Sequence, residues 1–121
     1  MNATKRKYLE ELGVDFPVTL ARCLGNEEFY VHLLEKFLRG TYIEDIEKGL
    51  EQGDYEMAFR ACHSLKGVSV NLGLDRLYET TIPLTEALRQ PPYDVEKIQA
   101  YFEIVKKSHR ENVENIKKAL A

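Results

Sequence analysis

The residues best suited to chemistry are His63, Lys66 and Gly67, in the stretch ACHSLKGVSVNLG at positions 61–73. An unperturbed imidazole is largely neutral near pH 7, so one ring nitrogen keeps a free lone pair and can act as a nucleophile. Lys66 follows three residues later and can pair with an anion attached to the ring. A phosphoryl group, with three acceptor oxygens and close to two negative charges, suits such a cation.

Gly67 points to the same chemistry, because a glycine inside a helix costs roughly 1 kcal/mol relative to alanine. Helical side chains lean toward the N-terminus, so a side chain at position 67 would lean over His63. Its absence leaves the imidazole uncovered and open to a bulky group. A lone helical histidine is usually structural or merely solvated. Here the lysine and the glycine together favour a functional histidine.

A helix over residues 54–72 would place His63 on its outer face. The predicted core face consists of apolar residues at helical spacing: Ala58, Ala61, Leu65, Val68 and Leu72, with Cys62 and Ser69 along one flank. The outer face around His63 combines cations with apolar side chains: Phe59, Arg60, Lys66, Gly67 and Val70, with Leu74 just beyond. Isolated exposed apolar residues are normal and helix-surface cations are usually just solvated. Beside a histidine, this set favours a docking patch for a partner.

The elements that must position this helix are themselves helices, because apolar residues recur at helical spacing along almost the whole chain. Short helices are expected at about 4–12 and from Asp15 to before Gly25. Four longer segments follow, at about 27–52, 54–72, 75–90 and 95–120, and each is preceded or begun by a capping residue: Asn26, Asp54, Asp75 and Asp94. Gly40 predicts a bend in the first long segment, and Pro83 predicts a kink or local break in the third.

This pattern predicts an all-α fold, an up-down-up-down four-helix bundle with additional short N-terminal helices. We expect a single domain over residues 1–121, with the bundle core at about 26–120. No run of 18 apolar residues and no signal peptide is apparent, so the expected location is the cytoplasm. Cys23 and Cys62 lack CxxC spacing and are predicted to be reduced, buried thiols.

Several function classes are disfavoured by the composition. A net charge of −3 with both signs dispersed argues against a nucleic-acid binder. The chain has no nucleotide-binding loop, and no carboxylate cluster looks ready to hold Mg²⁺, so no cofactor of its own is expected. His32, with Glu28 and Glu35 at helical spacing, could hold a metal, but a surface ion pair explains it better. His109 falls on the apolar stripe of the last helix and is predicted to lie at the edge of the core.

The sequence resembles the histidine-containing phosphotransfer (HPt) domain family of multistep two-component signalling. The matching residues are HSLKGVSVNLG at 63–73, with further likeness in GVD at 13–15, LGNEEFYVHLLEKF at 24–37 and LEQGD at 50–54. The resemblance implies a four-helix bundle whose exposed histidine accepts a phosphoryl group from a receiver aspartyl phosphate and hands it to another receiver aspartate. It makes His63 the phospho-acceptor, Lys66 the phosphoryl-stabilising cation and Gly67 the clearance residue.

Three residues depart from the family pattern. Thr85 stands where many members carry a glutamine or glutamate near the histidine, Pro83 interrupts the same helix, and Cys62 replaces the usual alanine before the histidine. The first two place in question the support of the imidazole by the neighbouring helix.

The leading hypothesis is therefore a phosphorelay carrier, a monomer without catalytic machinery of its own. Its partners would be response-regulator receiver domains and a hybrid sensor histidine kinase, with Mg²⁺ supplied by the receiver. The docking patch would consist of Phe59, Arg60, Val70 and Leu74. Two alternatives stay open: a helical adaptor that docks receivers or kinases without being phosphorylated, and, more remotely, a metal-binding bundle that uses His32.

Overall fold

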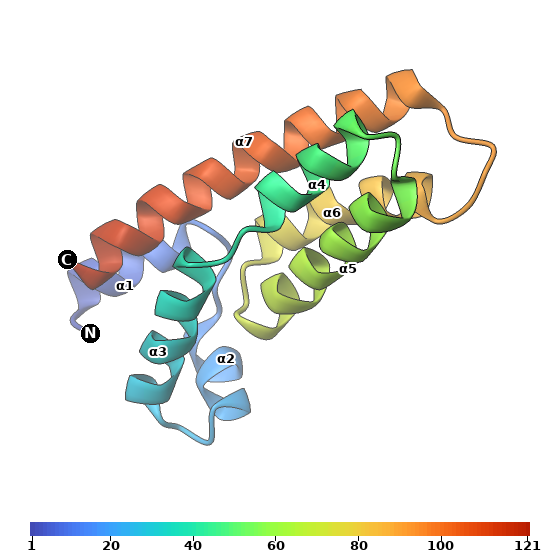
Figure 1. The fold of residues 1–121 in the computed structure, drawn as a ribbon. Coiled ribbons are helices and arrows are strands. Elements are labelled where there is room, and N and C mark those ends of the chain that lie inside the picture. Colours follow the sequence, from blue (N-terminus) through green and yellow to red (C-terminus); the bar gives the residue numbers. More distant parts are fainter.

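Seven α helices make up the computed structural model, which describes all residues from 1 to 121 (Figure 1). The helices are α1 (Ala3–Glu10), α2 (Phe16–Arg22), α3 (Glu27–Leu38), α4 (Tyr42–Glu51), α5 (Tyr55–Asn71), α6 (Asp75–Leu88) and α7 (Val95–Leu120). No strand is present, and the predicted all-α class is confirmed. No helix combines the length and the apolar character needed to cross a membrane.

The helix starts are set mostly by Asn and Asp caps, as the sequence predicts. The side chains of these caps accept a hydrogen bond from the backbone N–H three residues later: Asn2, Asp15, Asn26, Asp54 and Asp94. The cap predicted at Asp75 is wrong. Leu74 is the N-cap of α6 and Asp75 is its first residue, where its charge still favours the helix dipole.

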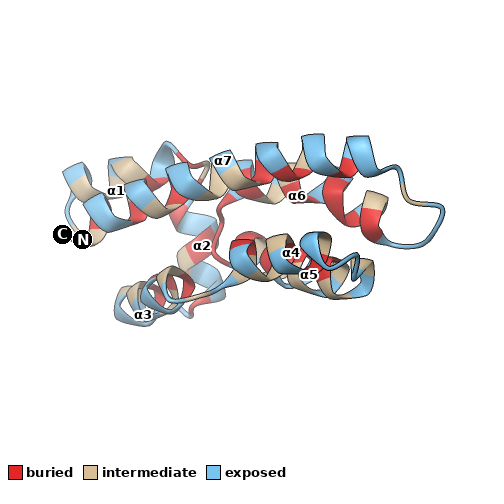
Figure 2. Ribbon diagram, turned by 45° about the horizontal axis from the view of Figure 1, so that its top comes forward, coloured by how far each residue is buried: buried red, intermediate tan, exposed pale blue.

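Helices α4 to α7 lie alongside one another and form the bundle (Figure 1). Buried residues face inward between the pair α4 and α5 and the pair α6 and α7 (Figure 2). Helix α7 runs past this bundle, and α1 packs along its C-terminal half, where Asn115 Nδ2 donates to the Tyr8 carbonyl. Helices α2 and α3 lie beyond the end of α5 (Figure 1). The up-down-up-down order of the four helices stays a prediction that their short connections support.

The long helix expected at 27–52 is two helices, since the chain leaves helical geometry between Leu38 and Tyr42. The Tyr42 ring folds back over Gly40 and occupies the space that a side chain there would need. The same ring stacks on Phe37 at a centroid distance of 6.0 Å. The glycine thus permits a full break where the sequence suggested only a bend, and the first bundle helix begins at Tyr42.

Helix α6 shows the opposite outcome: of the kink or local break predicted at Pro83, the break does not occur, because the helix is continuous from Asp75 to Leu88. Pro83 lies on the exposed side of the helix. Its lost hydrogen bond therefore faces solvent. The hydroxyls of Thr80, Thr81 and Thr85 donate to carbonyls of the same helix, at 2.7 Å each.

The core is a continuous cluster of 23 buried apolar residues, to which every helix contributes. On α5 the buried side differs from the prediction, since Cys62 and Ser69 are fully buried while Ala61 and Val68 are half-buried. The flank that carries Cys62 packs against α6, where Cys62 Sγ lies 3.2 Å from Thr85 Oγ1. Helix α5 is therefore turned further toward α6 than apolarity alone suggested.

Gly49 lets the end of α4 approach the start of α5. A Cβ at this position would lie 2.8 Å from the Ala58 backbone nitrogen and 2.9 Å from the Asp54 carbonyl oxygen. These are backbone atoms that cannot move without displacing α5.

We expect Gly49→Ala to lower the free energy of unfolding by roughly 1–3 kcal/mol, because the added methyl group overpacks this contact. Gly67→Ala is the matched control. A Cβ at position 67 meets no atom within 4 Å, so the gain in helix propensity of about 1 kcal/mol should appear unopposed. Urea unfolding followed by circular dichroism measures both. A Gly49→Ala protein as stable as the parent would contradict the close approach.

His109 lies at the edge of the core, as predicted, with its ring 5.5 Å from that of Phe37. Its Nε2 atom is buried and has no hydrogen-bond partner. Burial lowers the pKa of His109 from its usual 6.5, and the negative charge of Glu44 partly opposes this. The groove beside His109 is lined by charges of both signs: Glu44, Lys106, Arg110, Glu114 and Lys117.

Because the folded state holds His109 neutral more strongly than the unfolded chain does, the protein should lose stability as the pH falls below about 6.5. The loss should level off once the pH passes the lower pKa of the folded state. Urea midpoints between pH 8 and pH 5 measure it. His109→Phe should reduce this pH dependence, and His32→Gln, which removes an exposed histidine, serves as the control. An identical pH profile in His109→Phe would contradict the assignment.

Candidate functional site

His63 stands exposed in the middle of α5, as the helical wheel predicts. The ring of Phe59, one turn earlier, stacks beside it with centroids 5.8 Å apart and planes inclined by 30°. Helices α4 and α6 pack on the two sides of α5, so its backbone is held while its outer face stays free. The imidazole is thus supported from the N-terminal side by one aromatic ring and is open elsewhere to solvent.

Gly67 lies one turn after His63, and the space where its side chain would stand is empty. A Cβ built there has no heavy atom within 4 Å. Packing therefore does not require a glycine at this position, in contrast to Gly49. The remaining physical reason for the glycine is the clearance that it gives to His63.

Two cations flank His63, and they differ in how they are held. Lys66 is half-buried and forms no ion pair. Arg60 is exposed and is bound to Glu56, one turn earlier, at 2.7 Å. Lys66 is therefore the cation on α5 that is free to meet an anion on the imidazole.

A third cation, Arg89, comes from the C-terminal end of α6 and was missed by the sequence analysis. Its guanidinium carbon lies 5.3 Å from the centroid of the Phe59 ring, the ring that stacks beside His63. Its nitrogens donate to both oxygens of Glu86, at 2.8 and 3.3 Å. Its position over Phe59 depends on the packing of α6 against α5, so no motif in the sequence indicated it.

Thr85 does not support the imidazole, because its side chain is fully buried beneath α5. Its hydroxyl donates to the Thr81 carbonyl at 2.7 Å and lies within hydrogen-bond range of Cys62. Burial raises the pKa of the Cys62 thiol, while the contact with Thr85 and the charge of Lys66 oppose the rise. Cys62 and Cys23 are both free and buried, as predicted. At this position α6 thus holds α5 through the contact between Thr85 and Cys62, and the Thr85 hydroxyl is not available to the His63 ring.

The docking residues predicted beyond Lys66 have different outcomes. Phe59 and Val70 are half-buried on the outer face, and the Val70 carbonyl accepts a hydrogen bond from Arg22 at 2.7 Å. Leu74 is 0% exposed, so its assignment to the docking patch is wrong. Its N–H donates to the Ser69 carbonyl across the turn at Gly73, which directs the side chain into the core.

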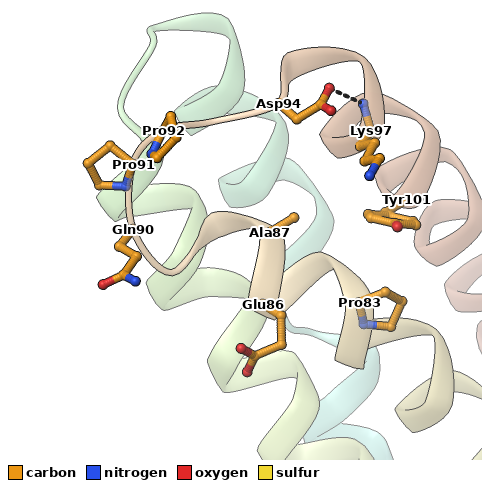
Figure 3. Close-up of a pocket in the computed structure, with 9 residues that line it drawn as sticks. All are labelled: Pro83, Glu86, Ala87, Gln90, Pro91, Pro92, Asp94, Lys97 and Tyr101. Carbon is orange, nitrogen blue, oxygen red and sulfur yellow. Dashed lines mark hydrogen bonds between the residues drawn. The ribbon is translucent and has the colours of Figure 1, made fainter.

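The largest depression on the molecule, about 540 Å³, does not include His63. It lies between α6, the 89–94 loop and the start of α7 (Figure 3). The dashed line in Figure 3 marks the hydrogen bond from the Lys97 backbone N–H to the Asp94 side chain, which caps α7. Elsewhere, His32 is exposed with its Nδ1 3.8 Å from a Glu35 oxygen, and no cluster of three His, Cys, Asp or Glu residues has metal-site geometry. His63 therefore stands on a helix surface, where a protein partner rather than a small molecule can surround it.

Comparison with known proteins gives one match. The family model described as "Hpt domain" matches residues 32–107, which include α4, α5, α6 and the site around His63. No curated protein and no solved structure shows a significant match.

Proposed function

Since the chain belongs to the Hpt domain family of phosphorelay carriers, we propose that His63 accepts a phosphoryl group from the aspartyl phosphate of a receiver domain. His63 would then pass the group to the aspartate of another receiver. The observation that carries this proposal is the exposed imidazole beside the empty space at Gly67. A partner's active site can cover such a ring without displacing any part of the bundle.

The chemical step needs only the imidazole on this side of the interface. A ring nitrogen directs its lone pair at phosphorus and forms the N–P bond. The bond between phosphorus and the aspartate oxygen breaks, and its electron pair returns to the receiver carboxylate. The reverse sequence of bonds delivers the group to the next receiver.

Lys66 would stabilise the charge on the transferred group, because it is the unpaired cation one turn from His63. The receiver would supply Mg²⁺ and the aspartate, so this chain acts as a carrier rather than an enzyme. Phe59, Arg60 and Val70 would form the docking patch for receiver domains and a hybrid sensor kinase. We expect a small, transient interface between a monomeric carrier and each partner. The two free, buried thiols support a cytoplasmic location.

The direct test uses a phosphorylated receiver domain as donor. The protein should gain an acid-labile, base-stable phosphate, detected by mass spectrometry under neutral conditions. His63→Gln should abolish the label, whereas His32→Gln, which removes another exposed histidine, should keep it. Binding to the receiver without any label on the parent protein would instead support the adaptor hypothesis.

Gly67→Leu should lower the initial rate of labelling at least tenfold, because the new side chain would lean over the imidazole. The helix content should stay unchanged. Gly67→Ala should have a smaller effect, because one methyl group covers less of the ring. Initial rates of labelling and circular dichroism of the same samples measure this. Labelling of Gly67→Leu at the parent rate would remove the clearance explanation.

A further inference from the structure

Glu86 holds Arg89, the cation that α6 contributes near the site, and the phosphotransfer step described above assigns no role to this ion pair. It binds Arg89 through both oxygens, and Arg89 lies over the Phe59 ring that stacks beside the imidazole. The hydrogen bonds and charge of Arg89 lower the pKa of the Glu86 carboxyl, and the charge of Lys66 adds to this. Glu86 is therefore a negatively charged partner of Arg89 that is also influenced by the charge of Lys66.

Breaking the ion pair between Glu86 and Arg89 requires little free energy. Both side chains are about half exposed, at 59% and 48%, and exposed ion pairs are weak. Arg89 lies at the end of α6, and no other residue forms an ion pair with its guanidinium. A guanidinium binds a phosphoryl group as readily as a carboxylate, and the phosphoryl group carries more charge and one more oxygen.

We propose that Glu86 is a displaceable counter-ion, which Arg89 exchanges for the phosphoryl group when His63 becomes phosphorylated. This inference rests on the proposed function of His63. Arg89 is then a positioning residue from α6, the helix whose Thr85 is buried and does not reach the imidazole. Glu86 opposes the phosphorylated state, because it competes with the phosphoryl oxygens for the same guanidinium.

Arg60 and Glu56 form a natural comparison on the other side of His63. They also make an exposed ion pair at 2.7 Å, on the same helix as the histidine. Arg60, however, pairs with Glu56 and not with Glu86, and the guanidinium that lies over the Phe59 ring is that of Arg89. A general effect of removing one negative charge near His63 should appear at both glutamates, whereas a counter-ion exchange should appear only at Glu86.

The test uses phosphoramidate, a small phosphodonor that needs no partner protein. Its P–N bond breaks and ammonia leaves as the bond between phosphorus and the His63 ring nitrogen forms. The second-order rate constant of labelling is compared in five variants: Glu86→Gln, Arg89→Gln, Arg89→Lys, Glu56→Gln and the double variant Glu86→Gln/Arg89→Gln. Circular dichroism confirms that each variant is folded.

Glu86→Gln should label about three- to fivefold faster than the parent, which is the scale of one exposed ion pair. Arg89→Gln should label about three- to fivefold slower, and Arg89→Lys should recover at least half of that loss. The double variant should behave like Arg89→Gln alone, because Glu86 acts through Arg89. In the parent, the Arg89 Nε–Hε nuclear magnetic resonance signal should shift on phosphorylation, and the Arg60 signal should not.

Three results would overturn the inference: Glu86→Gln at the parent rate, Glu56→Gln as fast as Glu86→Gln, or additive effects in the double variant. In each of these cases the parent is still labelled at His63, so the proposed function stands while the exchange fails. A folded parent that neither phosphoramidate nor a phosphorylated receiver labels at His63 would remove both.

Discussion

The rotation of α5 about its own axis is the constraint on which the site depends. Cys62 and Ser69 are fully buried against the bundle, and the Cys62 thiol meets the Thr85 hydroxyl of α6. On the opposite side, Gly49 brings the end of α4 within backbone contact of α5. With both flanks fixed, the side chain that follows Cys62 must point away from the core. The exposure of His63 is therefore a consequence of packing and not of a flexible surface.

The start of α5 and the exposure of His63 could be predicted from the sequence, because both depend on residues within this helix. Asp54 caps α5 as predicted, and the helical wheel correctly places His63 opposite the core. The sequence also showed that Gly67 lowers the stability of the helix and that no turn at this position requires a glycine. The structure supports the interpretation that Gly67 clears space for His63, because the space beside Gly67 is empty while the space beside Gly49 is filled by backbone atoms.

The errors arose where contacts between helices decide the outcome. The helical wheel predicts Leu74 at the edge of the outer face, but the turn at Gly73 directs its side chain into the core. Ala61 and Cys62 exchange their expected burial because α6 approaches from the side of the thiol. Arg89 is near Phe59 only because α6 packs beside α5, and no pattern within one helix contains that information. Side-chain reach across a bundle follows from helix packing, which apolar periodicity does not determine.

A carrier also has to release what it binds, and the charges around His63 suit that requirement. Strong, buried cations would stabilise the phosphorylated histidine and raise the barrier to the next transfer, since only interactions that strengthen in the transition state accelerate a reaction. The three cations here are weakly held: Lys66 is unpaired, and Arg60 and Arg89 rest on exposed glutamates. In the exchange proposed above, Arg89 moves toward an incoming phosphoryl group and returns to Glu86 when the group leaves. Weakly held cations therefore fit a carrier that has to release a phosphoryl group as well as accept it.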